Sequence, residues 1–184
     1  MLTTMTNTST AGASSPDTLT GALVRLWPYA PGVYGRDALY RVWKLMEDDG
    51  ATKQAFWDDA QGDLVSFVQM FAGPERLLLM IERIDTGTLC GCFWVSQMVP
   101  GHQAFVGMWM QRWHRGPVTV DAARLALDYV FAAGNFRQLW ALTPWLSGMA
   151  ICRRMGFEDV AVLPKFCRDG ETERAVHVYR LRRT

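Results

Sequence analysis

The stretch HQAFVGMWMQRWHRGPVTVDAARLALDYVFAAGNFRQLWALTP, residues 102–144, decides the fold of this chain. It reads as an apolar strand at 102–110, a charged loop with one glycine at 111–116, an amphipathic helix closed by Gly134, and a second strand at 139–142. A glycine loop that leads from a strand into a helix directs several backbone amides to one point, an arrangement that binds phosphate groups. The order of elements therefore indicates a phosphate site between this strand and this helix.

The rest of the chain supplies two helices before this unit and a short helix and a hairpin after it. Apolar residues recur at helical spacing, and the two long runs end at a glycine or a Gly-Pro pair. Short apolar runs bounded by turn residues predict strands. The expected elements are helices at about 36–48, 56–71 and 147–155, with Ser147 as the cap of the last, and strands at 77–84, 89–99, 160–166 and 175–181.

The connections between these elements predict how the sheet is built. Three consecutive strands joined by tight turns at 85–87 and 100–101 predict an antiparallel meander. The strand, helix, strand unit that follows predicts a parallel crossover. We therefore expect an α+β fold with a mixed, mostly antiparallel central sheet flanked by helices.

Composition limits the number of domains and the classes of partner. The chain has 184 residues, of which 49% are hydrophobic, enough for one sizeable core. Residues 1–20 are rich in Thr and Ser, so we expect a flexible tail before a single domain at 21–184. A net charge of +1 predicts no nucleic-acid or membrane partner. The absence of a signal sequence or apolar span predicts a cytoplasmic protein, and the Cys and His spacing predicts no metal site.

Two motifs give the chain a resemblance to a known family. RGP opens the crossover helix at 115–117, and RRMGF at 153–157 closes the short helix. With this order of elements the chain resembles the GNAT (GCN5-related N-acetyltransferase) superfamily over about residues 34–182. The resemblance implies an acyl-CoA N-acyltransferase fold that uses acetyl-CoA or another acyl-CoA as co-substrate and acylates an amine of a small molecule or protein. It is also compatible with a homo-oligomer.

The resemblance also implies which residues hold the acyl-CoA. The pantetheine arm of such a ligand pairs with the strand before the loop, and the pyrophosphate lies on amides at the start of the crossover helix. On this chain the strand residues are Met108, Trp109 and Met110. The pyrophosphate residues are Arg115, Gly116, Pro117, Val118, Thr119 and Val120.

Three of these residues depart from the family pattern. Val118 and Val120 stand where the family has small residues, and valine resists a positive φ. Pro117 removes one amide donor. At about 1.5 to 3 kcal/mol for each lost hydrogen bond to a charged group, pyrophosphate binding would weaken by on the order of 10² to 10⁴. Alternatively, Pro117 suits the first turn of a helix, where its N–H would be spare, and the loop is only tighter than usual.

Two residues are candidates for catalysis, each with a structural alternative. Cys152 stands where many family members have a tyrosine that protonates the departing thiolate, although a cysteine on a helix face also packs as a small apolar group. Glu82 is the best carboxylate for a general base, because it lies on a predicted central strand. It would equally pair with Arg83 or face solvent.

The eight tryptophans divide between the core and the presumed site. Those on apolar faces are predicted core residues: Trp43, Trp57, Trp94 and Trp140. Trp113 in the loop and Trp145 after a strand end would line an acceptor pocket, form an interface or fill the cleft.

Two functions follow from the sequence. One is N-acyl transfer from acyl-CoA to an amine. The other is a GNAT-fold protein without catalytic activity that serves as a structural, assembly or regulatory component, which would suit a phage-encoded or mobile-element protein by analogy.

Overall fold

The computed structural model describes residues 18–30, 36–55, 63–71, 76–169 and 171–183. They form one eight-stranded sheet in the order β1-β2-β3-β4-β5-β6-β8-β7. Only the β5–β6 pair is parallel, and every other neighbouring pair is antiparallel. The strands are β1 (Leu19–Thr20), β2 (Val24–Pro28), β3 (Leu77–Arg83), β4 (Leu89–Val99), β5 (Gln103–Met110), β6 (Gln138–Thr143), β7 (Glu158–Asp169) and β8 (Thr172–Arg182).

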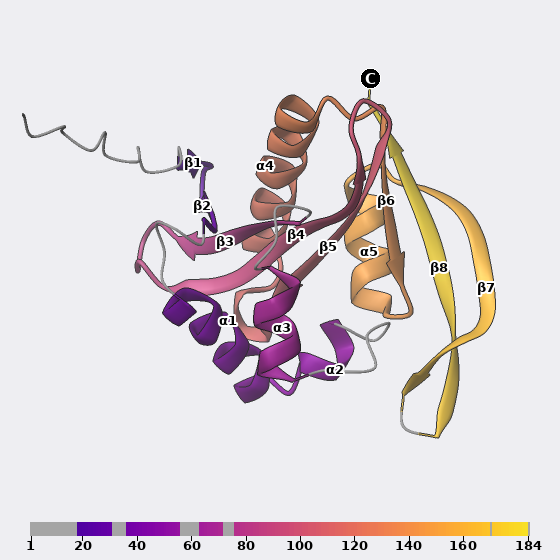
Figure 1. Ribbon diagram of the computed structural model, residues 1–184, viewed down its shortest axis with the longest axis horizontal. Coiled ribbons are helices and arrows are strands. Elements are labelled where there is room, and N and C mark those ends of the chain that lie inside the picture. Colours follow the sequence, from indigo (N-terminus) through magenta and orange to yellow (C-terminus); the bar gives the residue numbers. More distant parts are fainter. Residues whose placement is uncertain (1–17, 31–35, 56–62, 72–75, 170, 184) are drawn as a thin grey trace, which may run out of the picture.

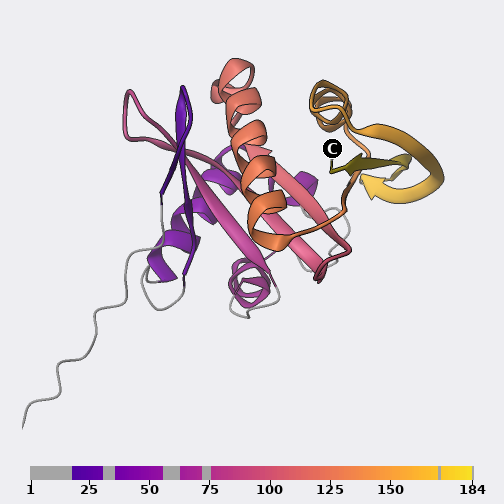
Figure 2. The ribbon, with the colours of Figure 1, turned by 90° about the horizontal axis from the view of Figure 1, so that it is seen from above.

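Helices cover both faces of this sheet (Figures 1 and 2). One face carries the N-terminal helices, and the other carries the crossover helix α4 and the short helix α5. The helices are α1 (Arg36–Asp48), α2 (Thr52–Ala55), α3 (Leu64–Met70), α4 (Pro117–Gly134) and α5 (Leu146–Arg154), with a 3-10 turn η1 at Arg112–His114. The α+β class, the antiparallel meander and the parallel crossover are thus confirmed.

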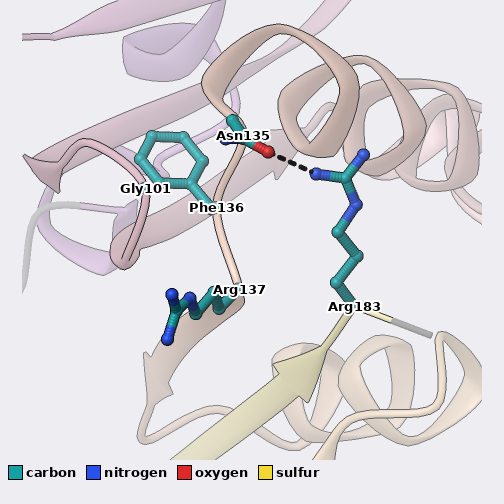
Figure 3. Close-up of a pocket in the computed structure, with 5 residues that line it drawn as sticks. All are labelled: Gly101, Asn135, Phe136, Arg137 and Arg183. Atoms are coloured by element: carbon teal, nitrogen blue, oxygen red, sulfur yellow. Dashed lines mark hydrogen bonds between the residues drawn. The ribbon is translucent and has the colours of Figure 1, made fainter.

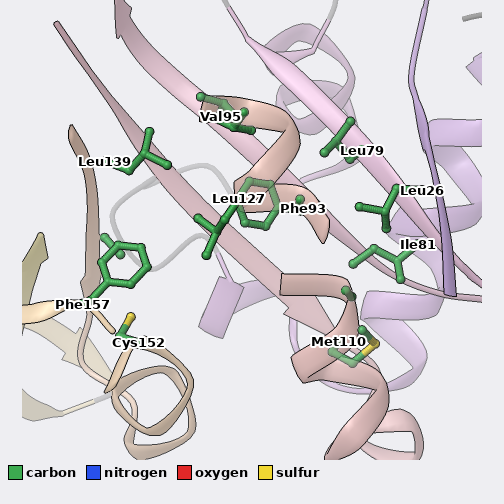
Figure 4. Close-up of a cluster of buried hydrophobic side chains, with 14 of the residues drawn as sticks. Leu26, Leu79, Ile81, Phe93, Val95, Met110, Leu127, Leu139, Cys152 and Phe157 are labelled. Atoms are coloured by element: carbon green, nitrogen blue, oxygen red, sulfur yellow. The ribbon is translucent and has the colours of Figure 1, made fainter. Parts of the chain in front are cut away.

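Two hydrophobic clusters lie on opposite faces of the sheet because side chains alternate along each strand. The cluster under α4 and α5 includes Phe93, Leu127 and Leu139, and Figure 4 shows these side chains converging. The cluster under α1 and α3 includes Trp43 and Phe67. Alternate residues of β4 and β5 therefore belong to one cluster or the other.

Three details differ from the sequence predictions. The strand β2 was not expected, although Val24 and Leu26 alternate with more exposed residues and are fully buried. The last helix has Trp145 at its N-cap and not Ser147, since the Trp145 carbonyl accepts the first helical hydrogen bond, from the Met149 N–H at 3.0 Å. The helix expected at 56–71 has its described part in α3, where the Asp63 carboxylate caps the helix by accepting the Ser66 N–H at 2.7 Å.

Two further expectations concern the ends of the described ranges. The predicted tail at 1–20 includes Leu19 and Thr20, which pair with Leu26 and Arg25 of β2, while residues 1–17 lie outside the described residues. Trp57, predicted to be in the core, also lies outside them.

Candidate functional site

The two strands of the parallel pair separate part-way along their length. β5 pairs with β6 only from Gln103 to Phe105. Along its other edge, β5 remains paired with β4 as far as Met110. A gap therefore opens in the sheet between residues 106–110 of β5 and residues 141–143 of β6.

Main-chain polar groups of β5 face this gap. The N–H of Gln111 donates to the carbonyl of Cys90 in β4 at 2.9 Å, whereas the carbonyl of His102 accepts from the N–H of Gln138, the first residue of β6, at 3.2 Å. Because main-chain groups alternate in direction along a strand, Met108 and Met110 direct theirs to the side that His102 faces. The β6 ladder has ended before these residues, so the N–H of Met108 is available for a ligand in the gap.

A second set of donors lies where α4 begins. Gly116 is the N-cap, with φ 99° and ψ −129°, a conformation that essentially only glycine adopts. A Cβ there would meet no atom within 4 Å, so the space in front of the helix is open. The N–H groups of Gly116, Val118 and Thr119 donate to no residue that the structure describes. Free N–H groups at a helix N-terminus, together with the helix dipole, are suited to a bound anion.

The structure shows how the unusual residues fit this loop. Pro117 is the first residue of α4, where a missing N–H removes no helix hydrogen bond. Val118 packs its side chain into the core under α4, and Val120 lies in the helix and donates its N–H to Gly116 at 3.2 Å. Gly116 alone needs a positive φ in this loop, so neither valine is strained. The predicted weakening of pyrophosphate binding stays a prediction.

Side chains add to the donors at the start of α4. The Thr119 hydroxyl is buried and, among the described residues, has no hydrogen-bond partner. The Arg115 guanidinium donates from Nε to the carbonyl of Met110 at 3.4 Å, so it joins the loop to the end of β5. The three free amides and the nearby Arg115 cation at this helix terminus are therefore suited to a phosphate group, whereas the buried Thr119 hydroxyl is not exposed to the space in front of it.

A buried carboxylate at the end of α1 holds the same loop. The Asp49 side chain is only 2% exposed. Its Oδ2 accepts the backbone N–H of Arg112 at 3.2 Å, and its Oδ1 lies 3.2 Å from the Arg112 Nε in an ion pair without a hydrogen bond. Arg112 begins the η1 turn that leads to Gly116. Asp49 therefore links the helices on one face of the sheet to the phosphate loop on the other.

A cavity of about 650 Å³ lies at the gap and is lined from both faces of the sheet. Val106 and Met108 line it with side chains from the α4 face, whereas Trp94 and Phe105 line it from the α1–α3 face. Because these residues alternate along β4 and β5, the cavity reaches both sides through the gap. Two reactants could thus meet there from opposite faces.

The three predicted strand residues have different positions. Met108 lines the cavity and is half-buried. Trp109 is buried in the cluster under α1 and α3, and Met110 is buried in the cluster under α4. Neither of these two side chains is among those that line the cavity, although the main chain of Met110 faces the gap.

Glu82 lies away from the cavity. Its carboxylate accepts from Arg25 Nε at 2.9 Å, across the β2–β3 ladder that places these residues opposite each other. The predicted partner Arg83 binds Asp85 instead. Glu82 is therefore engaged in a cross-strand ion pair and is not among the residues that line the cavity.

Cys152 does line the cavity, from α5. Burial raises the pKa of its thiol to about 12. A thiol that weakly acidic is poorly suited to protonate a departing thiolate, whose own pKa is near that of an ordinary thiol, about 8.5. The neighbouring Tyr179 phenol is buried, has no hydrogen-bond partner among the described residues, and has a pKa raised by burial. It is not among the lining residues.

The two predicted substrate tryptophans are placed differently. Trp145 lines the cavity, and the Arg174 guanidinium lies 5.0 Å from its ring centroid. Trp113 lies on the η1 turn with its ring under the Arg112 guanidinium at 4.4 Å, and it is 72% exposed. The structure thus brings Trp145, Met108 and Cys152 together in one cavity and leaves Trp113 outside it.

Sequence reasoning missed Thr143 and Gly148. Thr143 is a buried polar residue that lies at the end of β6 and lines the cavity. Gly148 lets α5 approach it, because a Cβ there would collide with the Thr143 side chain. The sequence pattern that could have predicted this contact is a threonine at the end of a strand followed by a glycine in the first turn of the next helix.

A second cavity, of about 610 Å³, lies near the opposite end of α4. It is lined by Gly101, Asn135, Phe136, Arg137 and Arg183, and the Arg183 guanidinium donates to Asn135 at 2.9 Å (Figure 3).

Across the described residues, no group of three or more His, Cys, Asp and Glu side chains could hold a metal ion. None of the helices in the described ranges is long and apolar enough to cross a membrane.

Known structures share this fold. No protein-family model and no curated protein matches the sequence. A probable GNAT-family acetyltransferase from Chromobacterium violaceum has a TM-score of 0.69 at 18% identity, over 98% of this chain and 96% of that chain. Mycobacterium smegmatis RimJ in complex with a CoA disulfide has a TM-score of 0.70 at 16% identity, over 91% of this chain and 88% of that chain.

A third similar structure is an acetyltransferase from Salmonella typhimurium that modifies the N-terminal serine of a ribosomal subunit protein. Its TM-score is 0.73 at 12% identity, over 91% of this chain and 100% of that chain. These likenesses confirm the GNAT acyl-CoA N-acyltransferase fold. At such identities they show the fold alone, and the chemistry must be argued from the site.

Proposed function

We propose that this chain is an N-acetyltransferase that transfers the acetyl group of acetyl-CoA, or a related acyl group, to a primary amine. The observation that carries the proposal is the gap between β5 and β6, which has unpaired main-chain donors on its β5 edge and unpaired amides at the α4 terminus beside it. The CoA-bound RimJ structure with the same fold supports acyl-CoA as the co-substrate.

Each group of residues would have a separate role in acetyl transfer. Gly116, Val118 and Thr119 would hold the pyrophosphate, and the edge of β5 would bind the pantetheine arm. The amine nitrogen bonds to the thioester carbon, the carbon–sulfur bond breaks, and its electron pair leaves on the thiolate. The N–H of Met108 would stabilise the oxyanion formed between these events. The proton released by the amine passes to solvent, because no described lining residue is Asp, Glu or His.

That same lack of an acid or base among the described lining residues is the observation that favours the alternative, a GNAT-fold component without catalysis. Binding of acetyl-CoA separates the two. A ligand at 100 times its Kd that binds only the native state stabilises it by about 2.7 kcal/mol, which raises the Tm by a few degrees. The enzyme proposal fails if millimolar acetyl-CoA leaves the Tm unchanged and no thiol is released with any amine.

Gly116→Ala locates the binding site. Alanine at φ 99° strains the N-cap by about 1–3 kcal/mol and displaces the amides, so we expect the Tm shift with acetyl-CoA to disappear. The matched control is Gly101→Ala in the β4–β5 turn, where φ is 71° and a Cβ also meets no atom within 4 Å. This control should lose stability and keep the acetyl-CoA shift.

A further inference from the structure

The cavity has two halves of different chemistry, one on each face of the sheet. The half under α4 and α5 is apolar apart from Thr143 and Cys152, and it adjoins the proposed acyl-CoA site. The half on the α1–α3 face combines apolar and aromatic side chains with polar ones. These residues are Met70, Trp94 and Phe105, together with Arg76, Ser96 and Gln97.

Arg76 is the only charged side chain among the described residues that line the cavity. It directly precedes β3, and the register that pairs Leu77 with Val95 places it beside Ser96 of β4. Its guanidinium forms no hydrogen bond or ion pair with the described residues. Within the described part of the chain, Arg76 therefore brings a positive charge to this half of the cavity without a paired carboxylate.

The neighbouring backbone is shaped locally at the same place. β4 has an irregularity in its pairing with β5 between Ser96 and Val99, and Gln97 within it has a φ of 47°. Bulges of this kind re-aim side chains and are frequent next to active sites. Gln97 and Arg76 both line the cavity at this end of β4.

This arrangement favours one class of amine over others. A carboxylate gains charge-assisted, two-point hydrogen bonds from a guanidinium. Trp94 and Phe105 offer apolar surface to the body of the acceptor. A polyamine or a lysine-rich peptide would meet a positive charge and, among the described lining residues, no negative one.

We propose that the acceptor is a primary amine that also carries a carboxylate and an aromatic or aliphatic body, as an apolar amino acid does. Arg76 receives the carboxylate and acts as a specificity residue. The inference rests on the proposed acetyl transfer and adds the chemical class of the acceptor.

The test compares three amines with acetyl-CoA: phenylalanine, phenylalaninamide and spermidine. Thiol release gives kcat/KM for each, with native protein, with Arg76→Gln and with the control Arg124→Gln, which changes an exposed arginine of α4 outside the cavity lining. We expect phenylalanine to exceed phenylalaninamide by about 10-fold or more, as one charge-assisted contact of roughly 1.4 kcal/mol provides. Arg76→Gln should bring this ratio toward one, and Arg124→Gln should not.

The inference is wrong if spermidine or phenylalaninamide reacts as well as phenylalanine, or if Arg76→Gln leaves the ratio unchanged. If no amine reacts, the change in Tm that each amine causes in the presence of CoA tests the inference instead. The inference is wrong unless phenylalanine causes the largest increase in Tm and Arg76→Gln removes that increase. These failures differ from failure of the proposed function, because acetyl-CoA alone would still stabilise the protein and its Gly101→Ala control.

Discussion

The two edges of β5 differ, and the difference creates the site. Along the β4 edge the strand is paired from Gln103 to Met110, so its main-chain groups on that side are satisfied. Along the β6 edge pairing stops at Phe105, so the N–H groups of Met108 and Met110 have no partner in β6, while the Met110 carbonyl accepts from Arg115. A single strand is therefore a structural element on one side and, in the proposed function, the binding surface for the pantetheine arm on the other.

Burial follows the same division. The residues of β4 opposite the paired edge include Cys92 and Phe93, and both are buried. On the gap side, Val106 and Met108 are only half-buried because a cavity lies where a neighbouring strand would pack. Leaving main-chain groups unpaired costs free energy unless water or a ligand satisfies them. The proposed acyl-CoA would satisfy these groups by completing the ladder.

The largest effect should come from Met108→Pro, which removes the N–H that faces the gap and leaves the β4 ladder in place. Proline is tolerated where the N–H of a strand faces away from its neighbour. We expect the variant to fold and kcat to fall by about 10²- to 10³-fold, the usual loss for one oxyanion donor. Circular dichroism and thiol-release kinetics measure the two effects.

Met108→Leu is the matched control for the side chain, since it keeps the N–H. It should retain activity within a few-fold, because exchange of Met and Leu conserves volume. Equal losses in the two variants would mean that the side chain matters and the gap-facing N–H does not. A Met108→Pro protein with full activity would remove the functional distinction between the two edges of β5.

A smaller effect should follow Asp49→Asn, which weakens the link between α1 and the phosphate loop. The amide can still accept one hydrogen bond from Arg112, but the charge-assisted pair is lost. We expect KM for acetyl-CoA to rise about 10-fold, or roughly 1.4 kcal/mol, with kcat nearly unchanged. A purely structural role would lower the Tm without changing KM.

Lys44→Met is a suitable comparison for this prediction, because Lys44 pairs with Asp48 at 2.9 Å on the exposed side of the same helix. Exposed pairs of this kind contribute little to stability, because solvent screens them. Its loss should change neither KM nor kcat. If both variants raise KM alike, the effect belongs to helix α1 as a whole and not to the Asp49 contact.

The sequence predicts features that depend on neighbouring residues, and it does not predict features that depend on contacts between distant segments. The alternating strands, the helix after Gly116 and the crossover follow from local periodicity, and all are present. The gap does not follow, because the point where β5 and β6 separate depends on the packing of segments about 35 residues apart, as the Gln103–Gln138 pairing shows. For the same reason Glu82 was a reasonable catalytic candidate on its strand, and only the register reveals its pairing with Arg25.

The loop residues show a similar limit. Pro117, Val118 and Val120 departed from a motif and predicted weak binding. In the structure Pro117 occupies the first helix position and Val118 faces the core, so these departures do not block the amides. Whether a β-branched residue impairs a phosphate loop depends on its φ and its direction, which a one-dimensional pattern does not contain.

The smallest effect should follow Cys152→Ala. Burial raises the pKa of this thiol to about 12, so it stays protonated and weakly acidic across the range in which the enzyme would work. We expect kcat/KM to change by no more than about threefold, a barrier difference of roughly 0.7 kcal/mol. The profile of kcat/KM against pH from 7 to 10 should keep its shape. A loss of two orders of magnitude, or an altered basic limb, would restore Cys152 as the acid.

The same thiol gives a stability prediction that distinguishes packing from catalysis. Its pKa is higher in the folded chain than in the unfolded chain, where it is about 8.5, so its stabilising contribution is complete below pH 8.5 and is lost as the pH rises toward 12. Cys92, on the paired side of β5, has a pKa raised to about 12 by the same cause. The free energy of unfolding should therefore fall above pH 8.5, and Cys152→Ala and Cys92→Ala should each reduce that slope in urea titrations at pH 8 and 10. If Cys152→Ala and Cys92→Ala reduce the pH dependence of the free energy of unfolding by similar amounts, the Cys152 thiol is as well shielded from water as that of Cys92. If Cys152→Ala leaves this pH dependence unchanged, water in the cavity reaches the Cys152 thiol.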